Sequence, residues 1–357
     1  MRGKVLVAGF ATRHIAQSAA RAGYDVCAVD HFCDQDLAWY TSDRLSFQEL
    51  EELPDAMSRM AARHAFDFLI VTSGAEETSS PVPLCGTSRE TVKRFLDKLD
   101  IQHFFEDIPV PVPQLVPEGT FPVMVKPRRG AGGWRNAGIH NTDELAVWKS
   151  LYPDVPYISQ ELIDGIPASV CCVTDGTVAR AVAANEQILR GKGASAYGFS
   201  GSVTPVEHPD TARMLALAEQ IAAASGCKGT IGIDFVLGPH GPYAIEVNPR
   251  FQGTVDTVEA AYECNLFEYH VNACRGVLPG QKKPARFAAR SILFADKDLT
   301  LLADLKKLAP KVADIPWPGT SFEKDQAIVS VYGSGASRDE ALSVLDKNIS
   351  TVRQYMQ

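Results

Sequence analysis

The chain has 357 residues, of which 45% are hydrophobic and 22% are charged, and its formal net charge is -8. This length predicts a globular protein of about two or three domains, and the acidic balance argues against nucleic acids and anionic membranes as partners. No apolar run approaches the roughly 18 residues that span a bilayer, and the start lacks a signal-peptide pattern, so we expect a cytoplasmic protein. The eight cysteines form no C-x-x-C pair and are expected to be reduced structural thiols.

The first predicted elements alternate between strands and helices, at residues 4–10, 12–21, 25–30, 56–64 and 66–72. This alternation predicts a βαβ unit with a parallel sheet, and we assign residues 1–87 to a Rossmann-like N-terminal domain. Gly9 opens the first turn, but the second glycine of the dinucleotide fingerprint is missing, which argues against a nicotinamide-dependent oxidoreductase. Residues 73–77 lie at the carboxyl end of the third strand, where α/β sheets bind ligands, and are a candidate for substrate contacts.

A lysine and a glycine-rich loop follow in the next part of the chain. A helix predicted over residues 89–99 and a proline-rich connector precede an apolar strand that ends at Lys126, and Gly130, Gly132 and Gly133 come directly after it. Glycines let backbone N–H groups approach phosphate oxygens, and a lysine adds positive charge to the same place. The loop does not follow the GxxxxGK[ST] pattern, which excludes a P-loop NTPase, and by itself it also fits an ordinary turn.

Downstream, the sequence predicts a strand, an antiparallel pair, a Gly/Ser-rich stretch and a helix, at residues 157–165, 168–184, 189–202 and 210–225. After residue 276 the chain becomes more basic and then alternates between strands and helices. The last helix is expected to begin with a capping box, Ser337-x-x-Glu340.

The most informative segment is a hairpin predicted within residues 230–254. Asp234 and Glu246 each lie six residues from His240 in a strong turn signal, so a turn centred there places them opposite each other. Asn248 lies two residues after Glu246 and therefore points to the same face of its strand. Three such oxygen ligands suit Mg²⁺. The apolar residues around the two acids argue against an ordinary solvated turn.

Taken in order, these motifs resemble the ATP-grasp superfamily, and more narrowly its predicted carboxylate-amine ligases, which are related to biotin carboxylase. The likeness is carried by Lys126 with its glycine loop, the 12-residue spacing of Asp234 and Glu246, and the run E-x-N-x-R that ends at Arg250. It implies an α/β (α+β) fold with a Rossmann-like pre-ATP-grasp domain, a two-lobed ATP-grasp fold and a small C-terminal α+β segment. We place the two lobes and that segment at residues 88–157, 158–280 and 281–357.

The resemblance also implies a role for each motif residue. Mg²⁺ or Mn²⁺ would be bound by Asp234, Glu246 and Asn248, and the catalytic residues would be Arg250 and Lys126. The phosphates of ATP would contact Lys98, Lys126, Gly130, Gly132 and Gly133, and a hinge would hold its adenine with Gln160, Glu161, Leu162 and Ile163. Four further cations are candidates to hold a substrate carboxylate, with a solvated surface charge as the alternative for each: Arg190, Lys192, Arg286 and Arg290.

The activity implied by the resemblance is ligation: ATP activates a small-molecule carboxylate as an acyl phosphate, which an amine then captures. Amino acids, peptides and glutamate-bearing cofactor precursors are all compatible substrates. Thr254 stands where biotin carboxylases carry a glutamate, which disfavours bicarbonate carboxylation. A nucleotide-binding regulatory module without turnover remains the alternative, because residues 185–202 match the superfamily loosely. We expect no nucleic-acid or membrane partner, and a homodimer is the default.

Overall fold

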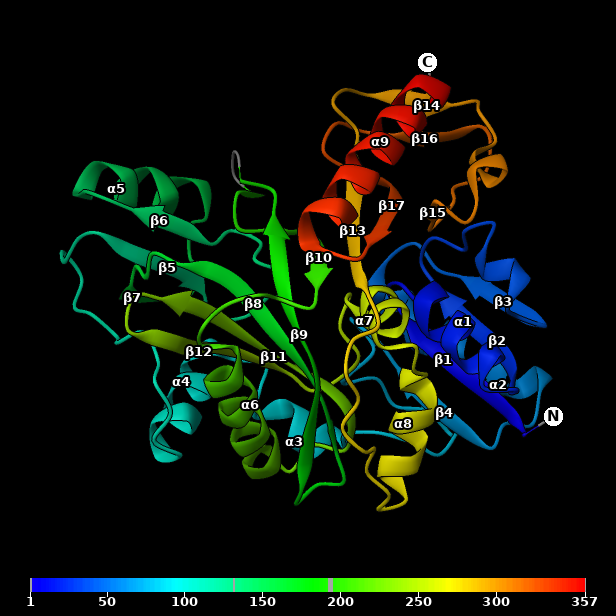
Figure 1. Cartoon of the computed structure of the whole chain (residues 1–357), viewed down its shortest axis with the longest axis horizontal. Helices are drawn as coiled ribbons and strands as arrows, with labels where there is room; N and C mark the ends of the chain where they lie inside the picture. Colours follow the sequence, from blue (N-terminus) through cyan, green and yellow to red (C-terminus); the bar gives the residue numbers. More distant parts are fainter. Residues whose placement is uncertain (1, 131, 192–194, 357) are drawn as a thin grey trace.

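The computed structural model describes residues 2–130, 132–191 and 195–356 (Figure 1). Its N-terminal part contains a parallel sheet of order β3-β2-β1-β4, formed by β1 (Lys4–Gly9), β2 (Asp25–Asp30), β3 (Asp43–Ser46) and β4 (Phe68–Val71). The parallel βαβ arrangement predicted from the alternation of elements is present. The short strand β3 was not predicted.

Helices cover both faces of this sheet. The side chains of β1 alternate, so Val5 clusters with Ile15 of α1 (Arg13–Arg21), whereas Leu6 clusters with Met57 of α2 (Leu53–Arg63). Burial on both faces explains why the strands are continuous apolar runs without a polar side. Two short 3₁₀ turns, η1 (Leu37–Trp39) and η2 (Leu50–Glu52), lie in the connections.

The helix predicted over residues 89–99 is wrong, because two helices occupy this region. Helix α3 (Arg89–Lys93) ends early, and α4 (Lys98–Asp107) begins after Asp97, whose carboxylate accepts a hydrogen bond from Leu99 N at 2.9 Å. Asp97 also pairs with Arg128 at 2.7 Å. As a result, Lys98 opens a helix, and its N–H donates to the carbonyl of Arg128.

A small antiparallel sheet of order β6-β5-β7 follows, made of β5 (Val123–Pro127), β6 (Ala137–Ile139) and β7 (Tyr157–Glu161). Helix α5 (Thr142–Leu151) packs against it through Leu145 and Trp148. This small lobe and the N-terminal sheet lie toward opposite sides of the molecule (Figure 1).

The largest sheet has the order β12-β11-β8-β9-β10-β13-β17-β15. Its strands are β8 (Ile166–Thr174), β9 (Ala179–Leu189), β10 (Phe199–Thr204), β11 (Gly229–Gly238), β12 (Gly241–Asn248), β13 (Phe287–Phe294), β15 (Val312–Ala313) and β17 (Ala327–Gly335). The antiparallel pair predicted at residues 168–184 is confirmed as β8 and β9. Because β13 pairs with β10, the sheet continues across the domain boundary predicted at residue 281, and that boundary stays a prediction.

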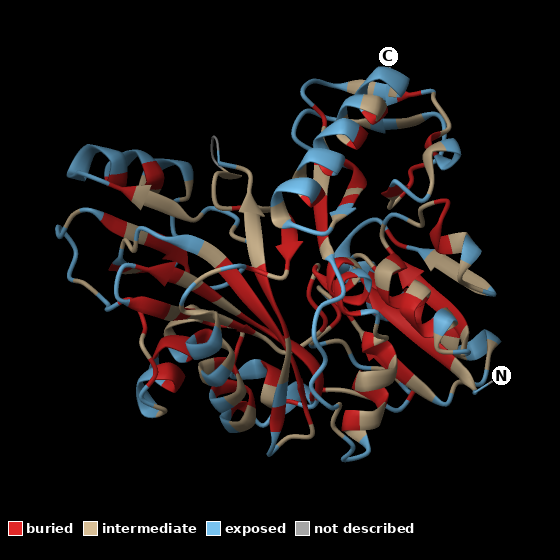
Figure 2. Ribbon diagram, in the orientation of Figure 1, coloured by how far each residue is buried: buried red, intermediate tan, exposed pale blue. Residues whose placement is uncertain are grey.

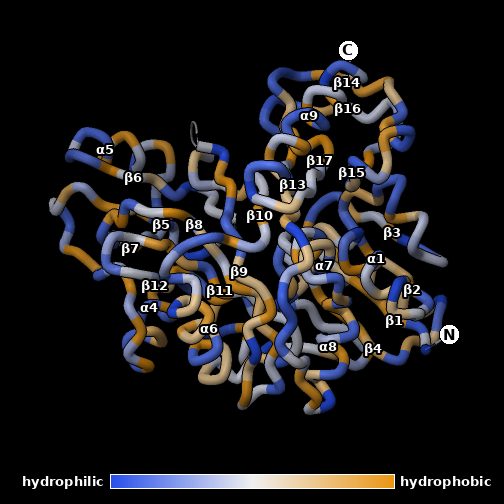
Figure 3. Tube along the Cα trace, viewed as in Figure 1, coloured by the Kyte–Doolittle hydropathy of each residue, from blue (hydrophilic) through white to orange (hydrophobic). Residues whose placement is uncertain are grey.

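The remaining elements complete the layers around this sheet: α6 (Thr211–Ser225), α7 (Val255–Tyr262), α8 (Leu266–Cys274), β14 (Leu299–Leu301), η4 (Leu305–Leu308), β16 (Thr320–Phe322) and α9 (Arg338–Met356). At the start of α9, Ser337 accepts from Glu340 N as predicted, whereas the Glu340 carboxylate accepts from Ala336 N. Buried and hydrophobic residues gather along the strands of the N-terminal and large sheets (Figures 2 and 3). Within the described residues, no helix is long and apolar enough to cross a membrane.

Candidate active site

A pocket of about 1250 Å³ lies where the small lobe, the large sheet and the N-terminal domain meet. Its walls include β5 and β7, the hairpin of β11 and β12, and the loops that follow β1, β2 and β4. The predicted metal residues Asp234, Glu246 and Asn248 all line this pocket. The hairpin therefore faces a cavity and is not an ordinary surface turn.

Asp234 and Glu246 are opposed across the hairpin, as predicted, but for a different reason. The turn pairs Gly238 with Gly241, so it is centred between Pro239 and His240, half a residue from the predicted centre. A bulge between Asp234 and Phe235 shifts the register by one residue and restores the opposition of the two acids. Bulges re-aim side chains in this way and are common beside active sites.

Asp234 is held by three amide side chains. Its Oδ2 accepts from Asn248 Nδ2 at 3.0 Å, and its Oδ1 accepts from Gln187 Nε2 at 3.0 Å and from Gln252 Nε2 at 2.9 Å. The two glutamines were not predicted. Gln252 follows the Arg250 motif by two residues and could have been found from its position, whereas Gln187 lies on β9, three strands from β12 in the sheet, and no local signal marks it.

Having Asp234 and Glu246 ionised at the same time is unfavourable in this pocket. Burial, and then the neighbouring Glu246 carboxylate, raise the pKa of Asp234 to about 7, although its hydrogen bonds oppose the shift. A divalent cation between the acids would relieve both effects. Carboxylate and amide oxygens are the ligands that Mg²⁺ prefers, so the residues present fit this ion.

Substituting Gly232 tests how Gln252 supports the candidate metal site. It lies opposite Asn248, and a Cβ placed on it would come within 1.7 Å of Gln252 Cδ. We expect Gly232→Ala to push Gln252 away from Asp234 and to weaken Mg²⁺-dependent activity by about 10–100-fold, the usual effect of losing a residue that orients a metal ligand. Manganese titration of Gly232→Ala and Gln252→Ala checks this, and an unchanged affinity in both variants would contradict it.

Lys126 provides a buried cation on the other side of the pocket. It lies near the end of β5, lines the pocket and is 6% exposed. Burial lowers its pKa to about 8, while Glu246 and Asp234 oppose this change and Lys98 reinforces it. Pairing with an anionic ligand such as a phosphate would offset the free-energy cost of burying this charged lysine.

The predicted flap, residues 130–133, requires glycine at its three described positions. Gly130, Gly132 and Gly133 have φ angles of 133°, 66° and 73°, and a Cβ on Gly133 would lie 2.0 Å from the carbonyl oxygen of Tyr197. Gly132 and Gly133 line the pocket, and Ala131 lies outside the described residues. Lys98 Nζ donates to the Gly130 carbonyl at 2.8 Å, so it braces the flap.

Three of the four predicted hinge residues line the pocket: Glu161, Leu162 and Ile163. Gln160 instead points into the protein, where its Nε2 donates to Gln102 Oε1 at 2.7 Å. Two hydrogen bonds with Gln114 hold Glu161 in place. The Glu161 N–H donates to the Gln114 carbonyl, and the Glu161 carboxylate accepts from Gln114 N.

The predicted arginines divide into two groups. Arg250 and Arg290 line the pocket, with Arg250 paired to Glu76 in the 73–77 segment that was a candidate for substrate contacts. Arg190 pairs with Asp325, and Arg286 pairs with Glu263 at the surface. Neither belongs to the described residues that line the pocket. Lys192 lies outside the described residues. The substrate roles of these cations stay predictions.

A buried ionic network that was not predicted lies beside Arg290. Arg13 of α1 is 3% exposed and contacts Asp256 at 2.7 Å, Asp314 at 2.8 Å and Asp36 at 3.6 Å. Arg290 shares Asp314 at 3.0 Å. Arg290, a candidate to hold a substrate carboxylate, is therefore already paired with a carboxylate of the chain.

The comparisons with known proteins agree with this geometry. Residues 95–254 match a family model described as an ATP-grasp domain. These residues are therefore assigned to an ATP-grasp domain. Structures similar to this chain include biotin carboxylase from Campylobacter jejuni in a β,γ-ATP complex, with a TM-score of 0.78, 16% identity and coverage of 97% of this chain and 90% of that one. L-amino acid ligase from Bacillus licheniformis has a TM-score of 0.74, 16% identity and 98% coverage of both chains.

Two sequence relatives extend the comparison. An uncharacterized protein of Methanocaldococcus jannaschii is 24% identical over 354 residues, which cover 92% of this chain and 87% of that one. The arginine-specific carbamoyl phosphate synthase large chain of Geobacillus stearothermophilus is 24% identical over 70% of this chain. This chain spans only 26% of that synthase. Together the findings confirm the predicted α/β fold with an ATP-grasp domain.

Proposed function

We propose that this ATP-grasp protein is a carboxylate-amine ligase, which activates a substrate carboxylate as an acyl phosphate and joins it to an amine. The observation that carries the proposal is the single pocket that contains Lys126, the opposed acids Asp234 and Glu246, and Arg250. The similarity to an L-amino acid ligase over nearly the whole of both chains supports it.

The pocket supplies what phosphoryl transfer requires, which is mostly positioning and electrostatic stabilisation. Lys126 and the flap N–H groups would hold the phosphates, and Arg250 would stabilise the charge that develops during transfer. Mg²⁺, held by Asp234, Glu246 and Asn248, would neutralise the phosphate oxygens. The substrate carboxylate attacks the γ-phosphorus and ADP leaves. The amine, which first loses a proton if it binds as an ammonium ion, then attacks the acyl carbon through its nitrogen lone pair, phosphate leaves, and the nitrogen loses a further proton.

The end of the same pocket that lies against the N-terminal domain fits a positively charged amine substrate. Asp34 lines this end, and burial together with Asp314, Asp30 and Asp36 raises its pKa to about 9. A cation placed beside Asp34 would stabilise its ionised form. Three exposed aromatic rings line the same end and can face a cation: Phe10, Phe32 and Trp317.

We therefore expect Asp34→Asn to raise the KM for the amine by about 10-fold or more, since a hydrogen bond to a charged group contributes about 1.5–3 kcal/mol. The KM for ATP should not change, because the adenine and phosphate contacts lie elsewhere in the pocket. Asp339→Asn is the control, as that side chain is 95% exposed. Equal KM values for the amine in wild type and Asp34→Asn would contradict this placement.

The proposal is tested by incubating the purified protein with Mg-ATP and pairs of candidate acids and amines, including amino acids, dipeptides and diamines. Phosphate release that requires both partners, with a product of the mass of the amide, is the expected result. Tight ATP binding in calorimetry without any such release would instead support the regulatory module. The nicotinamide-dependent alternative requires enhancement of NADH fluorescence on binding.

A further inference from the structure

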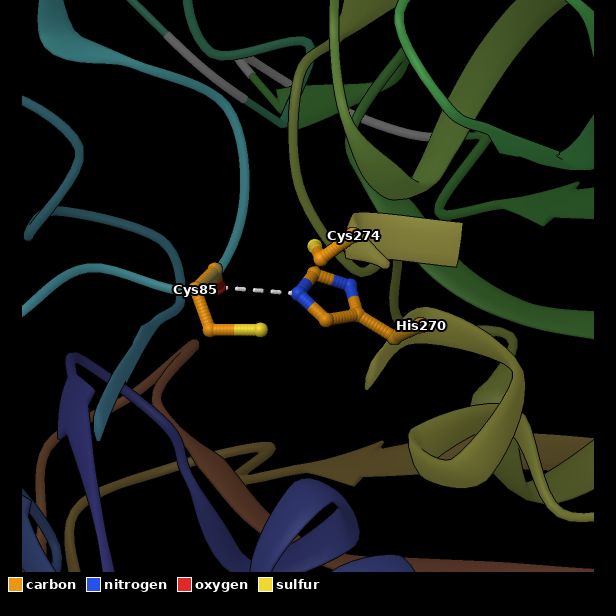
Figure 4. A group of neighbouring side chains, drawn as sticks. All are labelled: Cys85, His270 and Cys274. Atoms are coloured by element: carbon orange, nitrogen blue, oxygen red, sulfur yellow. Dashed lines mark hydrogen bonds between the residues drawn. The ribbon is translucent and has the colours of Figure 1, made fainter. Parts of the chain in front are cut away.

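Cys85, His270 and Cys274 form a cluster outside the pocket (Figure 4). One sulfur or nitrogen ligand atom from each lies within 4.8 Å of the others. Cys85 follows β4, where its N–H donates to the Leu69 carbonyl at 2.9 Å, so it belongs to the edge of the N-terminal sheet. His270 and Cys274 lie one turn apart on α8. The cluster thus joins the N-terminal domain to α8.

The hydrogen bonds of His270 argue against a metal ion in this cluster. Its Nδ1 accepts from the backbone N–H of Thr230 at 2.8 Å, so the neutral ring carries its proton on Nε2. That Nε2 lies 2.9 Å from the Cys85 carbonyl oxygen and donates to it (Figure 4). Binding a metal through Nε2 would move the proton to Nδ1, where it would face the Thr230 N–H. The two sulfurs are left as the reactive groups.

The two thiols are paired and accessible. The neighbouring Cys85 thiol, whose sulfur lies within 4.8 Å, lowers the pKa of Cys274 to about 5 despite its burial. The same contact and burial raise the pKa of Cys85. Both residues are partly exposed. A stabilised thiolate beside a second thiol is the arrangement of a redox-sensitive cysteine with its resolving partner.

We propose that Cys85 and Cys274 are a peroxide-sensitive thiol pair that forms a disulfide between the N-terminal domain and α8. The Cys274 thiolate attacks one oxygen of hydrogen peroxide, the O–O bond breaks, and a sulfenic acid and hydroxide form. Cys85 then loses its proton and attacks the Cys274 sulfur, so the S–S bond forms and water leaves. Two electrons pass from the thiols to the peroxide. This revises the prediction that all eight cysteines are only structural.

The imidazole ring of His270 connects the cluster to the candidate active site. The ring of His270 stacks on Phe251 with centroids 4.7 Å apart, and Phe251 lies between Arg250 and Gln252. The ring also fits tightly over the start of β11, where a Cβ on Gly229 would lie 2.3 Å from His270 Cε1. Movement of Cys274 toward Cys85 would therefore press on the segment that carries Arg250.

The test begins with the covalent step, whose readout does not depend on the proposed ligase activity. Wild type treated with hydrogen peroxide should lose two hydrogen atoms by intact mass and yield a linked peptide that contains Cys85 and Cys274. Cys85→Ser and Cys274→Ser should not form it, whereas Cys264→Ser, which removes another partly exposed thiol, should. At neutral pH, Cys274 should react with iodoacetamide at least about tenfold faster than Cys264.

Two results would overturn the proposal. One is wild type that forms no linked peptide, and the other is purified protein with about one zinc per chain that Cys274→Ser lacks, which would identify a metal site. The coupling is tested by measuring the affinity for a non-hydrolysable ATP analogue. Oxidation should change it at least about twofold, and a thiol reductant should restore it. A disulfide without that change would refute the coupling.

Discussion

Replacing Glu246 with alanine is expected to lower ATP-dependent phosphate release by more than about 100-fold, because losing a ligand should cost more than losing a residue that merely orients one. Glu246 lies opposite Asp234 across the bulged hairpin, and each acid also opposes the burial cost of Lys126. The variant therefore loses a proposed metal ligand and a counterion together. The measurement is phosphate release across a range of Mg²⁺ and Mn²⁺ concentrations.

Glu207→Ala is a suitable control for this variant, because Glu207 is exposed and does not line the pocket among its described residues. Thermal unfolding separates a binding defect from misfolding. Mg²⁺ should raise the Tm of wild type further in the presence of an ATP analogue than the analogue does alone, and Glu246→Ala should lack this increment. Unchanged phosphate release in Glu246→Ala would mean that the metal assignment is wrong.

Local signals were sufficient to predict the hairpin that carries the metal residues. Turn residues at 238–242 and the two-residue period of a strand together fix which side chains share a face, so Asp234, Glu246 and Asn248 could be grouped. The bulge could not be predicted, because its register depends on packing against β8 and on the tight turn. The prediction succeeded because the half-residue error in the turn centre moves the expected pairing by one residue, and the one-residue bulge cancels that shift.

Contacts between residues far apart in the sequence could not be predicted from local sequence patterns. Residues 89–99 are mostly good helix formers, and the break at Asp97 is stabilised by a cap and by Arg128, which lies 31 residues away. Gln187 meets Asp234 across a separation of 47 residues. The positive charges of Arg250 and Arg290 were visible in the sequence, but their carboxylate partners, Glu76 and Asp314, were not.

The paired arginines change how the site has to work. Because Arg250 and Arg290 each have a carboxylate partner in the chain, neither is a vacant anion site, and an incoming carboxylate must compete with Glu76 or Asp314. Lys126 differs, since burial lowers its pKa and an anionic phosphate would stabilise its charged form. The strongest attraction for nucleotide should therefore come from Lys126 and the metal. The arginines should mainly hold groups in position.

Arg13→Met is expected to lower the free energy of unfolding by about 3–5 kcal/mol, because it removes a buried cation that one buried and two partly buried carboxylates share. Those carboxylates, on Asp36, Asp256 and Asp314, come from the N-terminal domain, α7 and the segment after β15. Arg21→Met is the matched control on the same helix. Arg21 is 60% exposed, and its ion pair should contribute less than about 1 kcal/mol. Urea denaturation measures both variants, and similar losses would contradict the role of the network.

The pH dependence of the Arg13→Met effect follows from the same contacts. Burial alone would raise the pKa of Asp256 and Asp314, but the Arg13 guanidinium holds both below their usual value. A carboxyl with a depressed pKa contributes stability above its unfolded pKa of about 3.9, and this contribution is lost as the pH falls through the folded value. In Arg13→Met the acids repel each other and bind protons more readily. The difference in stability between wild type and variant should therefore be largest near neutral pH. It should shrink as the pH falls, first through the raised pKa values of the acids in the variant and then below about pH 4.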